Sequence, residues 1–514
     1  MSFLLPEGIL VVGGILMLLL DIFQYSKGKV FFSLTVIAYL TAMGILIGEF
    51  SLSAEHQLLS GMVNADLYGV MVKVLLLSIG LFISLIAAPY FGYILLKENN
   101  NSEKIYRSTP LNPPRPGDFF ALLLFTTVGM TLLATANDLL VVFFGLETMS
   151  LGLYGLAGLF PERVRSGEAA LKYLILGAFA SAFMLMGIAL IYGTNSGETH
   201  FSLLWGKESS VGEGITAQMP LYSVGIGLVW IGFLFKIAAV PFQFWAPDVY
   251  QGAPTPVTAL MSTGPKAAAF MAFTRLFGWA VPQTGEWWQG IIVLVSIATM
   301  TLGNIAALSQ SNIKRMLAYS SIAHAGYLLL APLVVSSPQS ELKTLAASAL
   351  YFYLTVYYLM NLSAFAIAYI VNRARHNQDY SIADYMGLAY RHPWLAITLG
   401  VVMISLAGIP PTAGFFAKFY LFAAAVKAGY TWLVVIAVIN SVISVYYYLR
   451  LVVYMFMKPL EKPITVVAHL PVALVMGISL IGLIFWGIFP RSLHHQSYHA
   501  AQQMLSSPPV ETHP

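Results

Sequence analysis

Long apolar segments separated by short polar ones run along almost the whole chain. About 20 helical residues cross a hydrocarbon core of roughly 30 Å, so apolar runs of about this length are typical of membrane-spanning helices. Fourteen such segments are predicted, at residues 6–23, 30–50, 67–96, 117–136, 139–160, 168–193, 221–246, 256–280, 289–308, 313–335, 345–371, 393–425, 430–457 and 465–489. The pattern predicts an all-α polytopic membrane protein with about 14 transmembrane helices.

Two regions depart from a simple series of spans. The segment 393–425 is too long for one straight helix, and it contains Gly408-Ile409-Pro410-Pro411. Proline removes a backbone donor and breaks a helix, so we expect a break there. The polar tail after Arg491 is expected to be an ordinary exposed end.

The basic loop residues predict an orientation. With fourteen spans, the odd-numbered loops hold fifteen of them: Lys27, Lys29, Lys97, Lys104, Arg107, Arg115, Arg163, Arg165, Lys314, Arg315, Arg373, Arg375, Arg391, Lys458 and Lys462. The even-numbered loops hold three: Lys207, Lys343 and Lys427. Because cytoplasmic loops carry the excess of Lys and Arg, the odd loops are expected in the cytoplasm and both termini on the outer side.

Composition narrows the function classes. The chain has 514 residues, of which 58% are hydrophobic and 9% charged, against roughly 45–50% apolar and about 25% charged in soluble domains. A soluble globular enzyme is therefore excluded, and the lipid bilayer is the expected environment. With no cysteine, disulfides, Cys-ligated zinc or Fe–S centres and thiol catalysis are excluded. No basic tract suggests a nucleic-acid partner.

Charged residues inside the predicted spans need an explanation. A charge near the bilayer centre costs at least about 2.5–3.5 kcal/mol and usually pairs or lines a polar pathway. Seven basic residues lie within spans, at Lys73, Lys172, Lys236, Lys266, Arg275, Lys418 and Arg450, while Glu147 is the one acid well inside. Arg275 and Arg450 lie near predicted helix ends, so we expect them to extend to the interface.

Lys236, Lys266, Lys418 and Glu147 lie near mid-span and are candidates for a proton relay. Burial disfavours a charged lysine and a neighbouring carboxylate favours it, so a lysine near Glu147 can exchange its proton when the local charge changes. Lys73 fits either a relay or a structural role.

Two further candidates have structural alternatives. Lys172 follows Glu168 by one helical turn, a spacing that also suits an interfacial ion pair. His324 follows Ser320 and Ser321 in its span. An imidazole that titrates near neutrality suits proton transfer, but a hydrogen-bonded core histidine fits equally well.

Helix breakers next to lysines indicate hydrated cavities. Lys236 precedes Pro241 and Lys418 follows Pro411, and carbonyls freed by proline persist in a membrane only against protein or water. Glu147 precedes Lys236 by 89 residues and His324 precedes Lys418 by 94. Discontinuous helices at matching places point to two inverted five-helix repeats, helices 4–8 and 9–13, each with a broken helix.

This organisation predicts four parts. They are helices 1–3 in residues 1–116, a first antiporter-like half in 117–280, a second in 289–457, and helix 14 with the polar tail in 458–514.

Five motifs resemble the antiporter-like membrane subunits of respiratory complex I. They are residues 147–151 (ETMSL), 168–173 (EAALKY), 235–256, 312–322 (NIKRMLAYSSI) and 408–418. The resemblance extends from about helix 4 to helix 13. Three features separate the chain from the M and L types: the Leu5-Pro6-Glu7 opening, Lys418 where subunit M typically carries glutamate, and no long lateral C-terminal helix.

The resemblance implies a proton-translocating subunit of the multi-subunit NADH:quinone oxidoreductase. It implies that Glu147 and Lys236 form a charge pair that Lys172 modulates, and that Lys266 leads toward the second half. His324 with Lys314 would lie on the linking route, and Lys418 would be the exit-side carrier.

The resemblance also implies surroundings for the chain. No cofactor is expected in it; NADH, FMN, Fe–S clusters and quinone would belong to partner subunits. The implied partners are subunit M and the small subunits K and J, in a bacterial inner (plasma) membrane.

Other functions fit the same residues. An Mrp-type cation/proton antiporter uses the same lysine and glutamate positions, a passive scaffold would carry its charges as relics, and a chloroplast or cyanobacterial complex that reduces plastoquinone has a similar pattern. Lysine carriers favour protons over sodium, because an ammonium group cannot ligate a cation.

Overall fold

A computed structural model of the chain consists almost entirely of helices. It describes residues 2–23, 28–49, 56–58, 61–92, 115–160, 162–201, 204, 214–279, 287–375, 379–459, 466 and 469–506. Six of the loop residues used to predict orientation lie outside these ranges: Lys27, Lys97, Lys104, Arg107, Lys207 and Lys462.

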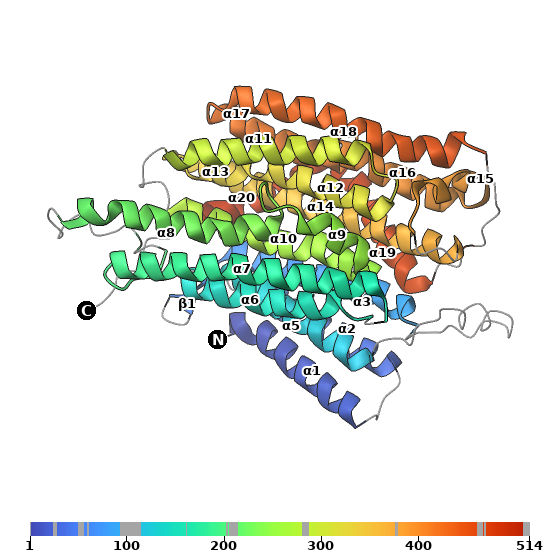
Figure 1. Ribbon diagram of the computed structural model, residues 1–514, viewed down its shortest axis with the longest axis horizontal. Coiled ribbons are helices and arrows are strands. Elements are labelled where there is room, and N and C mark those ends of the chain that lie inside the picture. Colours follow the sequence, from blue (N-terminus) through green and yellow to red (C-terminus); the bar gives the residue numbers. More distant parts are fainter. Residues whose placement is uncertain are drawn as a thin grey trace.

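The helices lie side by side, from α1 (Leu5–Ile22) at one edge to α17 (Ala413–Lys427) and α18 (Thr431–Met457) at the other, and the last two helices of the chain return to the middle of the bundle (Figure 1). The first half of the chain forms α1 (Leu5–Ile22), α2 (Gly28–Glu49), α3 (Leu67–Tyr90), α5 (Pro116–Thr135), α6 (Leu139–Ala157), α7 (Val164–Thr194), α8 (Gly214–Ile237), α9 (Trp245–Gly252) and α10 (Thr255–Trp279). The second half forms α11 (Trp287–Leu308), α12 (Ile313–Leu328), α13 (Leu330–Val335), α14 (Ser340–Arg375), α15 (Leu388–Arg391), α16 (Pro393–Ala407), α17 (Ala413–Lys427), α18 (Thr431–Met457), α19 (Leu470–Ile488) and α20 (Pro490–Ser506). The short elements are two 3₁₀ turns, Ser2–Leu4 and Ile382–Tyr385, and the antiparallel hairpin of β1 (His56–Leu58) and β2 (Val63–Ala65).

The predicted multi-pass all-α membrane fold is confirmed. Within the described ranges, twelve helices are long and apolar enough to cross a membrane. Two predicted spans are not among the twelve: 256–280, which forms α10 with buried Lys266 and Arg275, and 393–425, which is divided into α16 and α17. The count of fourteen and the inverted repeats stay predictions.

Both predicted helix breaks are present. α8 ends at Ile237, eight residues before α9 begins, and α16 ends at Ala407, six residues before α17 begins. Gly408 has φ +83°, and a Cβ there would lie 2.9 Å from Lys418 Cδ. The left-handed backbone conformation therefore requires glycine at this break, and the side chain of Lys418 passes close to it.

The 36-residue helix α14 forms the centre of the bundle. It packs against α10, α17, α19 and α20, and residues 346–371 are all buried. A helix buried on every side needs no polar face, yet this one carries several tyrosines, among them Tyr353 and Tyr357. Their hydroxyls must find partners inside the bundle.

The expectation of an ordinary exposed tail after Arg491 is wrong. Residues 490–506 form α20, which packs on α14, α3 and α19. Leu493, Ala500 and Met504 are buried on one side of it. Their spacings of seven and four residues place them on one helix face, which packs although the segment as a whole is polar.

Candidate functional site

Lys236 lies at the end of α8, directly before the first break, and is buried. Its Nζ donates to Ser150 Oγ at 2.8 Å and to Tyr173 Oη at 3.0 Å. Trp245, the first residue of α9, stacks on Tyr173 with ring centroids 4.5 Å apart and donates to the Phe235 carbonyl at 3.0 Å. The two sides of the break are thus joined around this lysine.

Glu147 lies one helical turn before Ser150 on α6 and accepts a hydrogen bond from Ser181 of α7. Within the described residues, no ion pair joins Glu147 to Lys236. Ser150 and Tyr173 hold the ammonium group instead. The structure therefore brings the two residues into one neighbourhood without direct contact.

Lys172 joins an ionic cluster at the ends of α7, α9 and α12. Its Nζ lies 2.6 Å from Glu168 and 2.9 Å from Asp248, and Arg315 Nη1 lies 2.7 Å from the other Asp248 oxygen. Burial raises the pKa of Asp248, but the hydrogen bonds from Lys172 and Arg315 outweigh it and hold the pKa below its ordinary value of 3.8. Asp248 stays ionised and connects helices of the first and second predicted halves.

Lys314 is buried at the start of α12. Its Nζ donates to the carbonyls of Ala253 at 2.6 Å and Gln251 at 3.3 Å, in the connection that follows α9. His324 lies about three turns further along the same helix, or roughly 15 Å. Lys314 and His324, which were predicted to act together, therefore share a helix but do not touch.

Lys266 of α10 reaches the middle of α12. Its Nζ donates to the Ser321 hydroxyl at 2.6 Å and to the Ser321 carbonyl at 2.7 Å. Tyr357 of α14 donates to the same hydroxyl at 2.8 Å, and its ring lies 5.1 Å from that of His324. One serine thus links a lysine of the first predicted half to the tyrosines of α14.

His324 is buried among tyrosines. Its Nδ1 lies 2.7 Å from Tyr353 Oη and its Nε2 3.2 Å from Tyr448 Oη. Tyr448 also hydrogen-bonds to Ser320. Both ring nitrogens are occupied by hydroxyl groups, which can donate or accept a proton.

Lys418 lies in α17 beside the second break and is buried. Its Nζ donates to Ser441 Oγ at 2.8 Å and to the Ala407 carbonyl, freed by the break, at 2.9 Å. It also lies 5.3 Å from the centroid of the Tyr327 ring, one turn beyond His324. The same break that requires Gly408 thus supplies an acceptor for the lysine.

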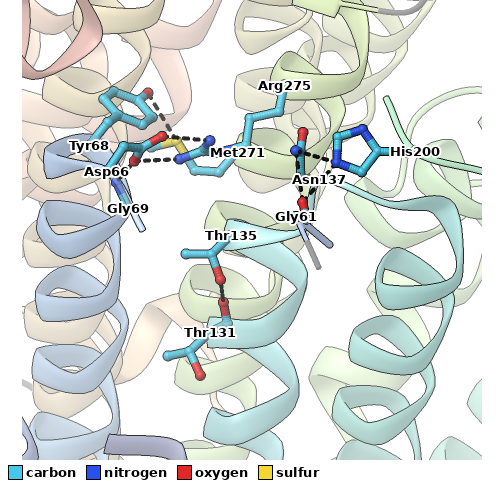
Figure 2. A network of polar contacts seen from close by, with 10 residues as sticks. All are labelled: Gly61, Asp66, Tyr68, Gly69, Thr131, Thr135, Asn137, His200, Met271 and Arg275. Atoms are coloured by element: carbon cyan, nitrogen blue, oxygen red, sulfur yellow. Dashed lines mark hydrogen bonds and ion pairs between the residues drawn. The ribbon is translucent and has the colours of Figure 1, made fainter. Parts of the chain in front are cut away.

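Arg275 does not extend to the interface as expected. It is buried and forms a bidentate ion pair with Asp66, with both N–O distances 2.9 Å (Figure 2). Asp66 also caps α3 by accepting from Gly69 N. The interfacial expectation failed because Arg275 has a carboxylate partner within the protein. That carboxylate lies just before a span and is 209 residues away in sequence, so the pairing depends on tertiary packing.

A second polar cluster lies near this ion pair in Figure 2. Asn137 Nδ2 and His200 Nε2 both contact the Gly61 carbonyl, at 3.0 and 2.8 Å, and lie 3.0 Å from each other. These contacts join the segment before β2 to the α5–α6 turn.

Lys73 has a structural partner. Its Nζ lies 2.9 Å from Glu7 Oε1, donates to the Phe3 carbonyl at 2.7 Å and lies 3.4 Å from the centroid of the Phe3 ring. Both charged side chains are buried. Of the two roles left open for Lys73, the structure supports the ion pair, which ties α1 to α3.

Four buried lysines share one kind of environment: Lys236, Lys266, Lys314 and Lys418. Each donates only to hydroxyl or carbonyl oxygens, and in the described part of the chain none lies within ion-pair distance of a carboxylate. Such a group can gain or lose a proton without leaving a counter-charge unpaired. A series of them can pass a proton.

Sequence reasoning missed several members of this site. Ser150, Tyr173 and Tyr357 carry hydroxyls in otherwise apolar helices, and Asp248 lies in the aromatic segment after the first break. Ser150 and Tyr173 belong to motifs already singled out for their charged residues, so their hydroxyls were a readable signal. No three His, Asp or Glu side chains gather into a possible metal site within the described ranges.

A family model described as "NADH:quinone oxidoreductase/Mrp antiporter, TM" matches residues 136–444. This range includes all seven predicted site residues. The chain is 42% identical over 501 residues to a protein from Trichlorobacter lovleyi named NADH-quinone oxidoreductase subunit N, covering 96% of this chain and 95% of that one.

Solved structures agree. A chain of respiratory complex I from Thermus thermophilus with bound aureothin is 33% identical, with a TM-score of 0.76, covering 95% of this chain and 98% of that chain. A chain of the Mrp complex from Dietzia sp. DQ12-45-1b has a TM-score of 0.80 at 20% identity, with 98% of each chain covered. The second likeness extends to the fold alone.

Proposed function

The chain belongs to the NADH:quinone oxidoreductase/Mrp antiporter family of membrane subunits, in the group of subunit N, and we propose that it moves protons along its buried lysines. Its function as a proton-translocating subunit of NADH:quinone oxidoreductase follows from the family. What we propose in addition is which residues carry the protons. The observation that carries it is that Lys236, Lys266 and Lys418 are buried among neutral oxygens, without a carboxylate partner in the described chain.

The first step takes place between Glu147 and Lys236. A negative charge at Glu147 favours the ammonium form of Lys236, and moving the charges apart disfavours it. Ser150 and Tyr173 hold the ammonium group in the meantime. Lys172 modulates this step through Asp248, which also contacts Arg315 of α12.

The proton then crosses to the second half through Lys266. Lys266, Ser321 and Tyr357 form a continuous hydrogen-bonded series, and the Tyr357 ring lies against His324. His324 connects to Tyr353 and Tyr448. Side-chain and backbone groups thus line the route from α10 to α14 and α18, and water would complete the transfers between them.

Lys418 completes the route as the exit-side carrier. It lies against Tyr327, one turn from His324, and at the broken helix where free carbonyls attract water. Lys314 would lie off the direct route, because its partners are carbonyls at the end of α9.

The wider assignment follows the family. Residues 117–280 and 289–457 form two inverted antiporter-like halves, preceded by residues 1–116 and followed by 458–514. Subunit M and the small subunits K and J are the proposed neighbours in a bacterial inner membrane, with both termini on the outer side. Partner subunits hold NADH, FMN, the Fe–S clusters and the quinone site.

The test is Lys236→Ala in the assembled complex. We expect NADH-driven quinone reduction and formation of the proton gradient both to fall at least tenfold while a blue-native gel shows an intact complex. Lys427→Ala, at the exposed end of α17, is the matched control and should leave both activities unchanged. Unchanged activities in Lys236→Ala membranes would exclude the relay and favour a passive scaffold.

An Mrp-type antiporter remains the second candidate, because the family model includes both classes and the Mrp fold is shared. Purification decides between them. NADH dehydrogenase subunits should accompany this chain in the first case, and small Mrp partners in the second.

A further inference from the structure

Helix α20 runs alongside the bundle from the level of the second break to the end of α10. Just before it, Gly487 packs against the break, since a Cβ there would collide with the Pro411 carbonyl oxygen. The His494 and Tyr420 rings then meet with centroids 4.1 Å apart. Near its end, Leu505 approaches Gly278, the penultimate residue of α10.

These contacts place the first turns of α20 at the depth of the hydrocarbon core. Tyr420 lies in the middle of α17, which rises roughly 22 Å from the break to its end. A hydrocarbon core of about 30 Å centred near the break extends about 15 Å toward that end. His494 lies at the level of Tyr420, about 11 Å from the break, so Arg491, Ser492 and His495 lie within the core, while His499, about 18 Å out, lies just beyond its boundary.

The outer face of α20 is polar. Its buried side consists of small and apolar residues, while the exposed side carries Arg491, Ser492, His495, Gln496, His499 and Gln502. His495 Nε2 and His499 Nε2 lie 3.2 Å apart, one turn from each other. Neither imidazole packs into the bundle.

The part of this face that lies within the hydrocarbon core, from Arg491 to Gln496, is costly against lipid. Arginine, amide and imidazole groups whose hydrogen-bonding capacity is not satisfied are strongly disfavoured in hydrocarbon. Helices of membrane complexes bury such groups against one another, where side chains such as His and Gln form hydrogen bonds between helices.

We propose that the exposed face of α20, centred on His495 and His499, is an interface with a transmembrane helix of a neighbouring subunit of the complex. The Arg, His and Gln side chains select a partner helix that presents amide or carboxylate side chains at the same depth. This interface depends on membership in a multi-subunit complex and not on the lysine relay, so each proposal can fail alone.

Photocrosslinking tests the interface in the intact complex. A photoreactive amino acid at position 495 or 499 should give a crosslinked product that contains a second, different subunit. The matched control is the same probe at Leu505, which faces Gly278 and should crosslink within this chain. Products with lipid only, or with a second copy of this chain, would overturn the proposal.

A second variant separates an interface from a lipid-facing surface. With His495→Leu and His499→Leu together, we expect at least a fivefold loss of assembled complex on blue-native gels, because the partner's polar groups lose their hydrogen bonds. Leucines on a surface that faces lipid would leave the amount of complex unchanged or raise it. Either of those two results would overturn the interface.

Discussion

Two groups of buried cations in this protein differ in their partners. Arg275 and Lys73 each meet a carboxylate at 2.9 Å, Asp66 in one case and Glu7 in the other. Lys236, Lys266 and Lys418 meet only hydroxyl and carbonyl oxygens. Burial alone therefore does not distinguish a structural cation from one that can carry a proton.

The difference lies in what happens when the proton leaves. A paired cation that loses its charge strands a buried carboxylate, which costs several kcal/mol, so the pair is fixed. A lysine among neutral oxygens leaves only an amine that still accepts and donates hydrogen bonds. The two groups should therefore respond in opposite ways to removal of the charge.

The largest expected effect is on the paired side. Arg275→Met leaves Asp66 buried and unpaired, and we expect a loss of about 3–5 kcal/mol in stability, seen as a large drop in assembled complex on blue-native gels and in its thermal midpoint. Adding Asp66→Asn should restore much of the loss, because it removes the stranded charge. If the single variant assembles like the wild type, the pair is not structural.

The second effect is on the unpaired side. Lys266→Met keeps the volume of the side chain and strands no charge, so the complex should assemble with its thermal midpoint nearly unchanged. Loss of a proton-transfer group typically costs about a hundredfold or more, and we expect proton pumping to fall by about that factor. Pumping at the normal rate would remove Lys266 from the route.

A smaller effect is expected at the ionic cluster between the halves. Asp248→Asn keeps the shape of the side chain but weakens its contacts with Lys172 and Arg315. Because Asp248 is more than a third exposed, these contacts contribute up to about 1 kcal/mol. We therefore expect the measured turnover of the complex to fall by at most roughly fivefold.

The pH dependence separates modulation from proton transfer at Asp248. Its pKa is lowered below 3.8 in the folded chain. The contribution of the ionised form is therefore fully present above pH 3.8 and is lost only as the pH falls through the lowered pKa. Between pH 6 and 8 the Asp248→Asn profile of turnover should therefore run parallel to the wild type. A changed slope in that range would indicate that Asp248 itself carries the proton.

An effect as small as that at Asp248 is expected at Tyr173. Tyr173→Phe removes one of the two acceptors of Lys236 and keeps the ring that stacks on Trp245. One hydrogen bond contributes about 0.5–1.5 kcal/mol, so pumping should fall by about two- to tenfold with assembly intact. Ser150→Ala is the matched variant, because it removes the other acceptor.

The sequence predicted the parts of the fold that depend on local pattern. The apolar segments, the two breaks and the mid-span lysines were all readable, because segment length, proline and charge act over one helix. The partners were not readable. Arg275 meets Asp66 across 209 residues, and Lys73 of α3 meets Glu7 of α1, so those pairings depend on tertiary packing.

Within the site, the charged residues were predicted and the neutral ones were missed. Ser150, Tyr173 and Tyr357 are common residue types, and only the packing of α6, α7, α12 and α14 shows that they contact lysines or their partners. The polar tail was misjudged for a related reason. Its mean composition is polar, and only its helical spacing shows the face that packs in α20.

The burial of α14 has a consequence for the response to the bilayer. Helices at the rim adjust to membranes of different thickness by tilting, but α14 has no residue facing lipid between positions 346 and 371. Changes in acyl-chain length would therefore act on peripheral helices such as α1 and α2 and leave the spacing of His324 and Tyr353 unaltered. The protein would carry its central contacts unchanged from thin to thick bilayers.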